Sequence, residues 1–154
     1  MSPIDLIECD PGDPAALFCR ERYYAELATQ FEHGFDVGRS RDPAAAQLVR
    51  PLGAFVVALC GVLPVGCIAL KGSGGTVAEI KRMWIDPAQR GIGLARRLMA
   101  QAVEIARELG IQTLQLDTNR ALTKAIATYR HWGWREISRF NDDPYAEVFF
   151  EKSL

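Results

Sequence analysis

One stretch, Glu79 to Met99, restricts the fold of this chain more than any other, because it has the pattern of a strand, a turn and a helix. Asp86-Pro87 ends the extended part, since a proline cannot donate to a sheet and disfavours helical geometry in the residue before it. The turn that follows carries Gly91 and Gly93 just ahead of the helix. Residues without Cβ let consecutive backbone N–H groups close on an anion at the positive end of the helix dipole. The stretch therefore predicts a site for a phosphate-bearing ligand.

Two common phosphate loops do not fit this turn. A P-loop needs Lys followed by Ser or Thr after its second glycine, and here Leu94-Ala95 follows Gly93. A dinucleotide fingerprint needs a third glycine three residues after Gly93, where this chain has Arg96. What remains is Gln89-Arg90-Gly91-Ile92-Gly93-Leu94-Ala95. It resembles the acyl-CoA loop of the GNAT superfamily of N-acetyltransferases, Gln/Arg-x-x-Gly-x-Gly/Ala, with either Arg90 or Gln89 in the first position.

The resemblance continues beyond the glycine turn. It passes through Asp117, and the run Ala125-Ile-Ala-Thr-Tyr-Arg-His-Trp-Gly-Trp134 is similar to the superfamily's Ala-x-x-Leu-Tyr-x-x-x-Gly-Phe segment. It covers about residues 53 to 139. The resemblance implies an α/β (α+β) fold whose mixed, mostly antiparallel sheet has about six to seven strands. That sheet would be splayed between two parallel strands and flanked by about four helices. Length and composition predict a single domain over residues 1–154.

Side-chain parity on the central strand predicts a β-bulge. Ala78 and Ile80 are apolar two positions apart, as are Met83 and Ile85, but the step from Ile80 to Met83 is three. Because side chains alternate between the faces of a strand, an odd step needs one extra residue, near Lys81-Arg82. In the superfamily a bulge at this point helps to splay two parallel strands, and the acyl-CoA arm lies in the gap.

The resemblance implies acetyl-CoA as the cofactor. Backbone N–H groups of the glycine turn would receive its pyrophosphate, and strand N–H groups beyond the bulge would polarise its thioester carbonyl. The cofactor-binding residues predicted in this way are Met83, Trp84, Ile85, Gln89, Arg90, Gly91, Ile92, Gly93, Leu94, Ala95 and Asn119. The superfamily's common asparagine falls here on Leu122. Either Asn119, one helical turn earlier, replaces it, or that contact is absent.

Tyr129 occupies the position of the superfamily's frequent general-acid tyrosine. A phenol of pKa about 10 can protonate a thiolate whose conjugate acid has a pKa near 8.5, so the chemistry is consistent. Spacing alone instead predicts that Tyr129 is a core residue on an apolar helix face with Leu122, Ala125 and Ile126.

Transfer to an amine also needs a proton acceptor, because an amine of pKa about 10 is mostly protonated at neutral pH. Glu79 lies just before the bulge, where some superfamily members keep a glutamate that acts as the base directly or through water. It is predicted as catalytic with Tyr129. The alternatives are that Asp117 or a chain of waters is the base, and that Glu79 only pairs with Lys81 across a sheet face.

Periodicity and turn residues predict the other elements. They are a strand at 4–8, a helix from Asp13 to near Gly34, a loop at 34–43, a short helix at 44–49, strands at 54–59 and 65–70, a helix at 93–109, a strand at 111–117, a helix at 121–132, and strands at 134–139 and 146–152. In the superfamily the N-terminal helix and loop line the acceptor site. Tyr23, Tyr24, Phe31 and Phe35 either touch the acceptor or pack the helix onto the sheet. The segment 141–145 either faces the acceptor or is only a turn.

Composition excludes several classes of protein. A formal net charge of −1 gives no general attraction to nucleic acid or to a membrane surface. No apolar run approaches the length of a membrane span, and the first residues lack a signal pattern, so a cytoplasmic protein is expected. Four cysteines without Cys-x-x-Cys spacing and two histidines predict no metal site.

The sequence therefore predicts an N-acetyltransferase that moves an acetyl group from acetyl-CoA to a primary amine of a small molecule, protein or peptide. The resemblance implies direct transfer in a ternary complex. The alternative is a non-catalytic acyl-CoA-binding sensor or interaction module on the same fold. Loop 34–43 holds charges of both signs and selects no acceptor. An exposed terminal strand favours a homodimer.

Overall fold

A computed structural model describes residues 3–39 and 44–154 of the chain. Its centre is a seven-stranded sheet with the order β1-β2-β3-β4-β5-β7-β6. The strands are β1 (Ile4–Glu8), β2 (Ala54–Cys60), β3 (Leu63–Lys71), β4 (Val77–Ile85), β5 (Thr113–Thr118), β6 (Arg135–Ile137) and β7 (Val148–Ser153). Neighbouring strands are antiparallel except β4 and β5, which are parallel. The predicted mixed, mostly antiparallel sheet is confirmed.

The described residues form three α-helices: α1 (Pro14–Gln30), α2 (Leu94–Glu108) and α3 (Thr123–His131). About four helices were predicted, and the difference lies at 44–49, where the chain forms only the 3₁₀ turn Ala45–Leu48. The predicted end of α1 near Gly34 is also wrong, because Phe31 is already extended, with φ −87° and ψ 137°. Residues 40–43 of the predicted loop lie outside the described residues.

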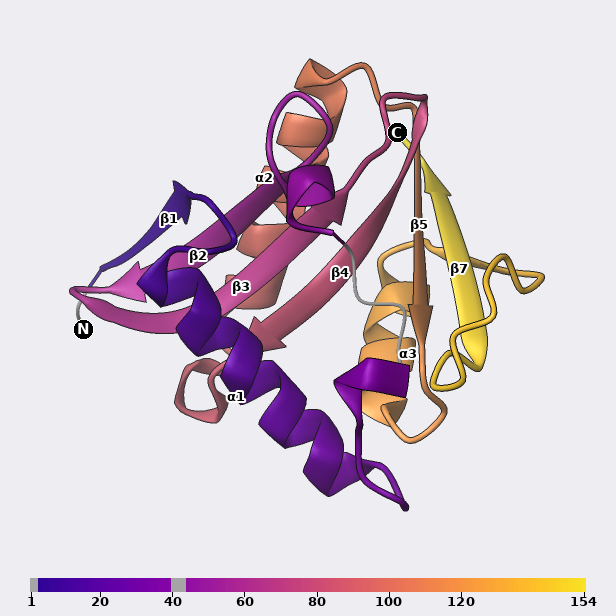
Figure 1. Ribbon diagram of the computed structural model, residues 1–154, viewed down its shortest axis with the longest axis horizontal. Helices are drawn as coiled ribbons and strands as arrows, with labels where there is room; N and C mark the ends of the chain where they lie inside the picture. The colour runs from indigo at the N-terminus through magenta and orange to yellow at the C-terminus, as the bar shows by residue number, and fades with distance from the viewer. Residues whose placement is uncertain (1–2, 40–43) are drawn as a thin grey trace.

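The helices cover both faces of the sheet. Figure 1 shows α1 crossing in front of the strands and α2 behind them. Ala16 and Cys19 of α1 pack with Phe55 and Trp84 on one face. The apolar stripe of α2 packs on the other face together with Tyr129 of α3, and its most deeply buried members are Leu98, Ala102, Ile105 and Ala106. Since side chains alternate along each strand, the sheet supplies both cores.

A bulge interrupts β4 where parity predicts it. Lys81 lies opposite Ala69 and Trp84 lies opposite Cys67, so β4 has one more residue than β3 between these pairs. Arg82 within the bulge has φ +51°, an uncommon conformation for a residue with a Cβ. The predicted bulge near Lys81-Arg82 is confirmed.

Beyond this point β4 separates from β5. The parallel pairing runs only from Val77 and Thr113 to Glu79 and Gln115. Figure 1 shows the two strands diverging below the paired part. The second half of β4 therefore has a neighbour on one side, β3, and a gap on the other.

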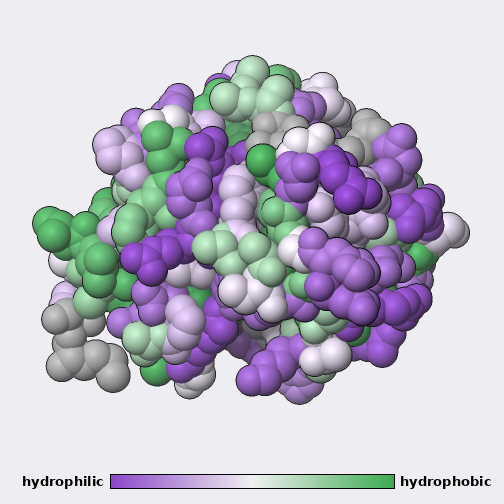
Figure 2. Space-filling model, turned by 60° about the horizontal axis from the view of Figure 1, so that its bottom comes forward, coloured by the Kyte–Doolittle hydropathy of each residue, from purple (hydrophilic) through white to green (hydrophobic). Residues whose placement is uncertain are grey.

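Hydrophobic side chains gather on one side of the molecule in the view of Figure 2. The exposed apolar side chains Ile7, Val62 and Leu63 lie on β1 and at the turn between β2 and β3. Figure 2 shows hydrophobic residues gathered on the side of the molecule where this turn lies in Figure 1. Because β1 is an edge strand, a second copy of the protein could pair with it. The homodimer expected from the sequence stays a prediction. No helix within residues 3–39 and 44–154 combines the length and the apolar character needed to cross a bilayer.

Candidate active site

Two adjoining cavities lie beside β4. The larger, of about 980 Å³, extends along the glycine turn and the first residues of α2. The smaller, of about 130 Å³, lies among α1, β4, β5 and the segment 141–145. Both are lined by the same junction residues, Tyr23, Leu27, Met83, Leu122, Ala125 and Tyr129. A ligand in one cavity can therefore reach a ligand in the other at this junction.

Most of the residues predicted to bind the cofactor are brought together in the wall of the larger cavity. They are Met83, Trp84, Ile85, Gln89, Arg90, Gly91, Gly93, Leu94 and Ala95. Two others lie elsewhere. Ile92 is 48% exposed and is not part of this wall, and Asn119 lines the smaller cavity.

The glycine turn has the backbone of an anion site. Gly91 and Gly93 both have φ +84°, and a Cβ at either position would meet no atom within 4 Å, so the space above them is open. Gly93 is the N-cap of α2, and the first bond into the helix runs from the Arg97 N–H to the Gly93 carbonyl. The N–H groups of Leu94 to Arg96 have no partner within the helix. These donors and the helix dipole suit a phosphate group.

Strand β4 also turns N–H groups toward the gap. The Asp86 N–H donates to the Val65 carbonyl of β3 at 2.8 Å. Because N–H groups alternate along a strand, those of Ile85 and Met83 point away from β3. The Ile85 carbonyl points the same way, since it accepts from Arg90 Nε at 3.1 Å. These groups provide donors for a carbonyl oxygen placed in the gap.

The two arginines near the turn make contacts within the protein. Arg90 Nη2 lies 2.6 Å from Glu26 Oε1, which ties the turn to α1. The Arg90 N–H donates to the Pro87 carbonyl at 3.4 Å, so this predicted phosphate donor is used inside the turn. The Arg96 guanidinium lies 5.5 Å from the centroid of the Trp132 ring, on the wall of the larger cavity.

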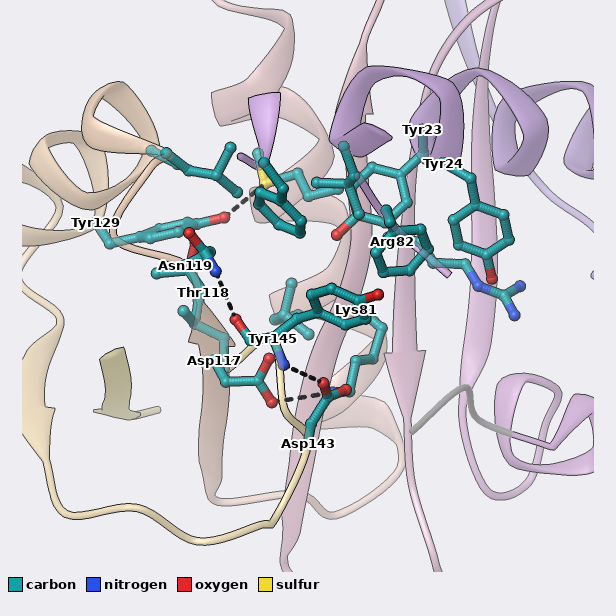
Figure 3. Close-up of a pocket in the computed structure, with 18 residues that line it drawn as sticks. Tyr23, Tyr24, Lys81, Arg82, Asp117, Thr118, Asn119, Tyr129, Asp143 and Tyr145 are labelled. Atoms are coloured by element: carbon teal, nitrogen blue, oxygen red, sulfur yellow. Dashed lines mark hydrogen bonds and ion pairs between the residues drawn. The ribbon is translucent and has the colours of Figure 1, made fainter. Parts of the chain in front are cut away.

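Tyr129 is both a core residue and a junction residue. Its ring packs at 6.0–6.4 Å between centroids against Trp132, Trp134 and Phe150. Its hydroxyl donates to Met83 Sδ at 3.8 Å, across the gap (Figure 3). Burial raises the pKa of the Tyr129 phenol to about 12, and the Asp117 carboxylate adds to this shift. The hydroxyl is therefore protonated at neutral pH and can act as a proton donor.

Ionisation of the Tyr129 phenol is expected to lower the free energy of unfolding at alkaline pH. Its pKa is about 12 in the folded protein and about 10 in the unfolded chain, so between these values the unfolded chain binds fewer protons. This contribution to the free energy of unfolding is complete below about pH 10 and is lost as the pH rises toward about 12. Urea unfolding at about pH 9 and about pH 11 should show a smaller loss for Tyr129→Phe than for the wild type. An equal loss in both proteins would contradict a buried phenol.

Glu79 is not brought together with Tyr129. It lies on the paired part of β4, outside the walls of both cavities. Its carboxylate is 3.2 Å from Lys81 Nζ and 3.6 Å from Lys71 Nζ. This is the arrangement of the alternative interpretation, a partner for Lys81 on a sheet face. The assignment of Glu79 as base stays a prediction.

Asn119 has both ends of its amide occupied within the protein. Its Nδ2 donates to the Tyr145 carbonyl at 2.9 Å, and its Oδ1 accepts from the Ala121 N–H at 2.9 Å. The residue thus connects the end of β5 to the segment that carries Tyr145. Its predicted contact with the cofactor stays a prediction.

Asp117, which the sequence offered only as an alternative base, and Tyr145, which it offered only as part of the segment 141–145, both lie at the smaller cavity. Asp117 Oδ2 accepts from Lys81 Nζ at 3.1 Å and from Asn141 Nδ2 at 2.7 Å. The Tyr145 ring stacks on Phe31, with centroids 5.5 Å apart. Asp117 lies within the part of the sequence that resembles the superfamily, and this resemblance was a reason to consider it as a site residue. Tyr145 has no local signal, because its contacts are with residues far away in the sequence.

Comparisons with known proteins find acetyltransferases. The model of the acetyltransferase (GNAT) family matches residues 20–134. The IAA acetyltransferase of Azospirillum brasilense is 36% identical over 112 residues, which cover 70% of this chain and 72% of that protein. The uncharacterized N-acetyltransferase YjgM of Escherichia coli K12 is 42% identical over 72 residues, which cover 47% of this chain and 43% of that protein.

Solved structures share the fold over nearly the whole chain. A GNAT-family acetyltransferase from Staphylococcus aureus Mu50 superposes with a TM-score of 0.80 at 18% identity, covering 98% of this chain and 99% of that chain. A GNAT-family acetyltransferase from Elizabethkingia anophelis with acetyl-CoA bound gives a TM-score of 0.66 at 14% identity, covering 98% of each chain.

Proposed function

The chain belongs to the GNAT family of acetyltransferases, and on that basis we propose that it transfers an acetyl group from acetyl-CoA to a primary amine of a small molecule or peptide. The observation that carries this proposal is the pair of cavities that meet at Tyr129 and Met83. Direct transfer needs two substrates in contact and one proton donor between them. A larger cleft, a smaller cavity and a buried hydroxyl at their junction meet those needs.

The residues of the larger cavity fit acetyl-CoA, the cofactor of this family. When bound, acetyl-CoA supplies an activated acetyl group whose leaving group is a thiolate. The N–H groups around Gly93 to Arg96 would hold its pyrophosphate, because they lack partners within the helix. The N–H groups of Met83 and Ile85 would hold the thioester oxygen and stabilise the negative charge that develops on it.

The protein's own groups balance the protons of the transfer. As the N–C bond forms and the C–S bond breaks, the amine nitrogen loses a proton and the sulfur gains one. Tyr129 donates its phenolic proton to the sulfur, since burial keeps this hydroxyl protonated at neutral pH. Asp117 or a water in the smaller cavity accepts the proton of the amine, since Asp117 lines that cavity and Glu79 does not.

A non-catalytic acyl-CoA-binding sensor on the same fold is the second candidate. It would need the larger cleft, but it would have no use for a second cavity with a hydroxyl at the junction. The enzyme proposal is therefore the better supported of the two. Turnover separates them, because a sensor binds acetyl-CoA without releasing free thiol in the presence of any amine.

Acetyl-CoA is expected to raise the melting temperature of the protein by about 5–10 °C. At a concentration of about 100 times Kd, binding adds about 2.7 kcal/mol to the free energy of unfolding, and for a domain of this size each kcal/mol is worth about 2–4 °C. Thermal unfolding with and without acetyl-CoA measures the shift, with ATP and NAD at the same concentration as controls. An unchanged melting temperature at millimolar acetyl-CoA would contradict the assignment of the cleft.

A further inference from the structure

We propose that the smaller cavity selects one class of acceptor, a small primary monoamine that carries a single aromatic ring, and that Asp117 binds its ammonium group. The inference rests on the proposed function, because it names the second substrate of the same site. Four features of the cavity lead to it: its ring-lined wall, its apolar floor and size, the contacts of Asp117, and the balance of charge.

Aromatic rings from three separate segments form the wall. Phe35 lies 4.8 Å from Tyr145 and 5.3 Å from Tyr24 between ring centroids, and Phe31 stacks on Tyr145 at 5.5 Å. The Tyr145 hydroxyl accepts from the Asp36 N–H at 2.8 Å, which holds the segment after α1 against this wall. All four rings are only half buried, so part of each ring surface is open to a ligand. Rings of this kind favour another ring in an offset or edge-to-face contact.

The floor of the cavity is apolar and its size is limited. Leu27, Leu116, Leu122 and Ala125 supply most of this floor. The volume of about 130 Å³ is close to that of an apolar protein cavity of about 150 Å³ that takes up benzene. One six-membered ring with a short chain therefore fits, and the face of a folded protein does not.

Asp117 has one carboxylate oxygen available to a ligand. Both of its hydrogen bonds, from Lys81 Nζ and from Asn141 Nδ2, go to Oδ2. Within residues 3–39 and 44–154, no group donates a hydrogen bond to Oδ1. Figure 3 shows Asp117 on the same side of the pocket as Tyr129, with Tyr23 and Tyr24 on the opposite side. An ammonium group bound at Oδ1 would lie on the Tyr129 side, with its ring toward the aromatic wall.

The charged groups that line the cavity leave the Asp117 Oδ1 atom as the position for an ammonium group. The formal charges of its lining cancel, since Lys81 and Arg82 are balanced by Asp117 and Asp143. Lys81 Nζ already lies between the carboxylates of Glu79 and Asp117, and Asp143 Oδ1 accepts from the Tyr145 N–H. The Arg82 guanidinium points away from Tyr129 and Asp117 (Figure 3).

Two consequences follow for the acceptor. An acceptor with its own carboxylate, such as an amino acid, would place that group beside Asp117, where the nearest cation, Lys81 Nζ, is already paired with Glu79 and Asp117. A diamine would bring a second ammonium group, for which the cavity has no second open carboxylate among those residues. Both losses are costly in a half-buried site. The preferred acceptor is therefore an aromatic monoamine.

The test compares matched amines with the wild-type protein at saturating acetyl-CoA, measured as free-thiol release with the product identified by mass spectrometry. The panel is phenethylamine, butylamine, putrescine, phenylalanine and a short peptide with a free α-amino group. We expect kcat/KM for phenethylamine to exceed each of the others by at least about tenfold. A preference for putrescine, phenylalanine or the peptide would overturn the inference, and equal rates for phenethylamine and butylamine would overturn its aromatic part.

Two variants locate the effect. Asp117→Asn is expected to raise KM for phenethylamine at least about tenfold with KM for acetyl-CoA unchanged, whereas the control Asp5→Asn, exposed on β1, should leave both unchanged. Phe35→Ala is expected to lower the ratio of kcat/KM for phenethylamine over butylamine. Because Phe35→Ala leaves every charged group in place, it still tests the inference if Asp117→Asn does not fold. An unchanged ratio would overturn the role of the wall.

The outcomes distinguish this inference from the proposed function. If acetyl-CoA raises the melting temperature and another class of amine is acetylated, the enzyme proposal stands and the acceptor inference is overturned. If acetyl-CoA stabilises the protein and no amine is acetylated, the sensor alternative is supported and the acceptor inference falls with the enzyme proposal. If acetyl-CoA does not bind, the assignment of the cleft itself is wrong.

Discussion

Replacing Tyr129 by phenylalanine is expected to lower kcat by about 100-fold or more while Kd for acetyl-CoA changes by less than about threefold. The substitution removes the proton donor to the departing sulfur, and general acid catalysis of this kind is worth about 10²–10⁴-fold in rate. The ring remains packed against Trp132, Trp134 and Phe150, and the hydroxyl gives up a weak hydrogen bond to Met83 Sδ at 3.8 Å. Thiol-release kinetics and calorimetric titration with acetyl-CoA measure the two quantities separately.

The same variant distinguishes a chemical role from a structural one. If kcat, the affinity for acetyl-CoA and the melting temperature of Tyr129→Phe all fell together, the hydroxyl would be a structural group. If kcat stayed within about threefold of the wild type, Tyr129 would not be the acid. Only a loss confined to kcat agrees with the position of the hydroxyl at the junction of the two cavities.

Replacing Gly93 by alanine is expected to weaken acetyl-CoA binding by at least about tenfold. Gly93 has φ +84°, which costs a residue with a Cβ about 1–2 kcal/mol, and relaxation of that strain would turn the neighbouring N–H groups away from the phosphate. A Cβ at this position meets no protein atom within 4 Å, so it would project into open space beside the proposed pyrophosphate. Calorimetric titration with acetyl-CoA gives the change in Kd.

Gly110→Ala is the matched control for this substitution. Gly110 follows α2 with φ +79°, and a Cβ there also meets nothing within 4 Å, but it lies outside the larger cavity. Both variants should lose a similar free energy of unfolding from backbone strain, and only Gly93→Ala should lose affinity for acetyl-CoA. Equal affinities in the two variants would show that the turn does not bind the cofactor.

Features of the fold that depend on neighbouring residues were predictable from the sequence. The odd step from Ile80 to Met83 predicts the bulge, because alternation along a strand is a local property. The glycine turn and the start of α2 follow from Gly91 and Gly93, since few other residues take up a positive φ. The parallel pairing of β4 and β5 follows from the intervening helix and a right-handed crossover.

Features that depend on distant contacts were not predictable. The sequence places the end of α1 near Gly34, but Phe31 is already extended, and its ring stacks on Tyr145. The bond from the Asp36 N–H to the Tyr145 hydroxyl joins residues 109 positions apart. The residues next to each segment in the sequence give no indication of this contact. The ring contacts at the smaller cavity are of this kind, although the resemblance pointed to Tyr24, Phe31 and Phe35 as residues that could touch an acceptor.

Which of the two carboxylates, Glu79 or Asp117, lies where it could act as the base depends on the register of the sheet. Both carboxylates lie next to Lys81, and sequence spacing does not separate them. The pairing of β4 with β5 ends at Glu79 and Gln115, so Glu79 stays in the joined part of the sheet. Asp117, two residues farther along β5, lies where the strands have separated and lines the smaller cavity. Register is set by tertiary packing, which a single sequence does not show.

Steady-state release of free thiol from acetyl-CoA, measured with and without a set of primary amines, is the direct test of whether the protein acetylates an amine. The set contains aromatic monoamines, aliphatic monoamines, polyamines, amino acids and peptides, and each product is identified by mass spectrometry. We expect thiol release that requires both the protein and an amine, is accompanied by an acetylated amine, and falls about 100-fold or more in Tyr129→Phe. Release no faster than the protein-free blank for every amine, with a protein that acetyl-CoA still stabilises, would contradict it.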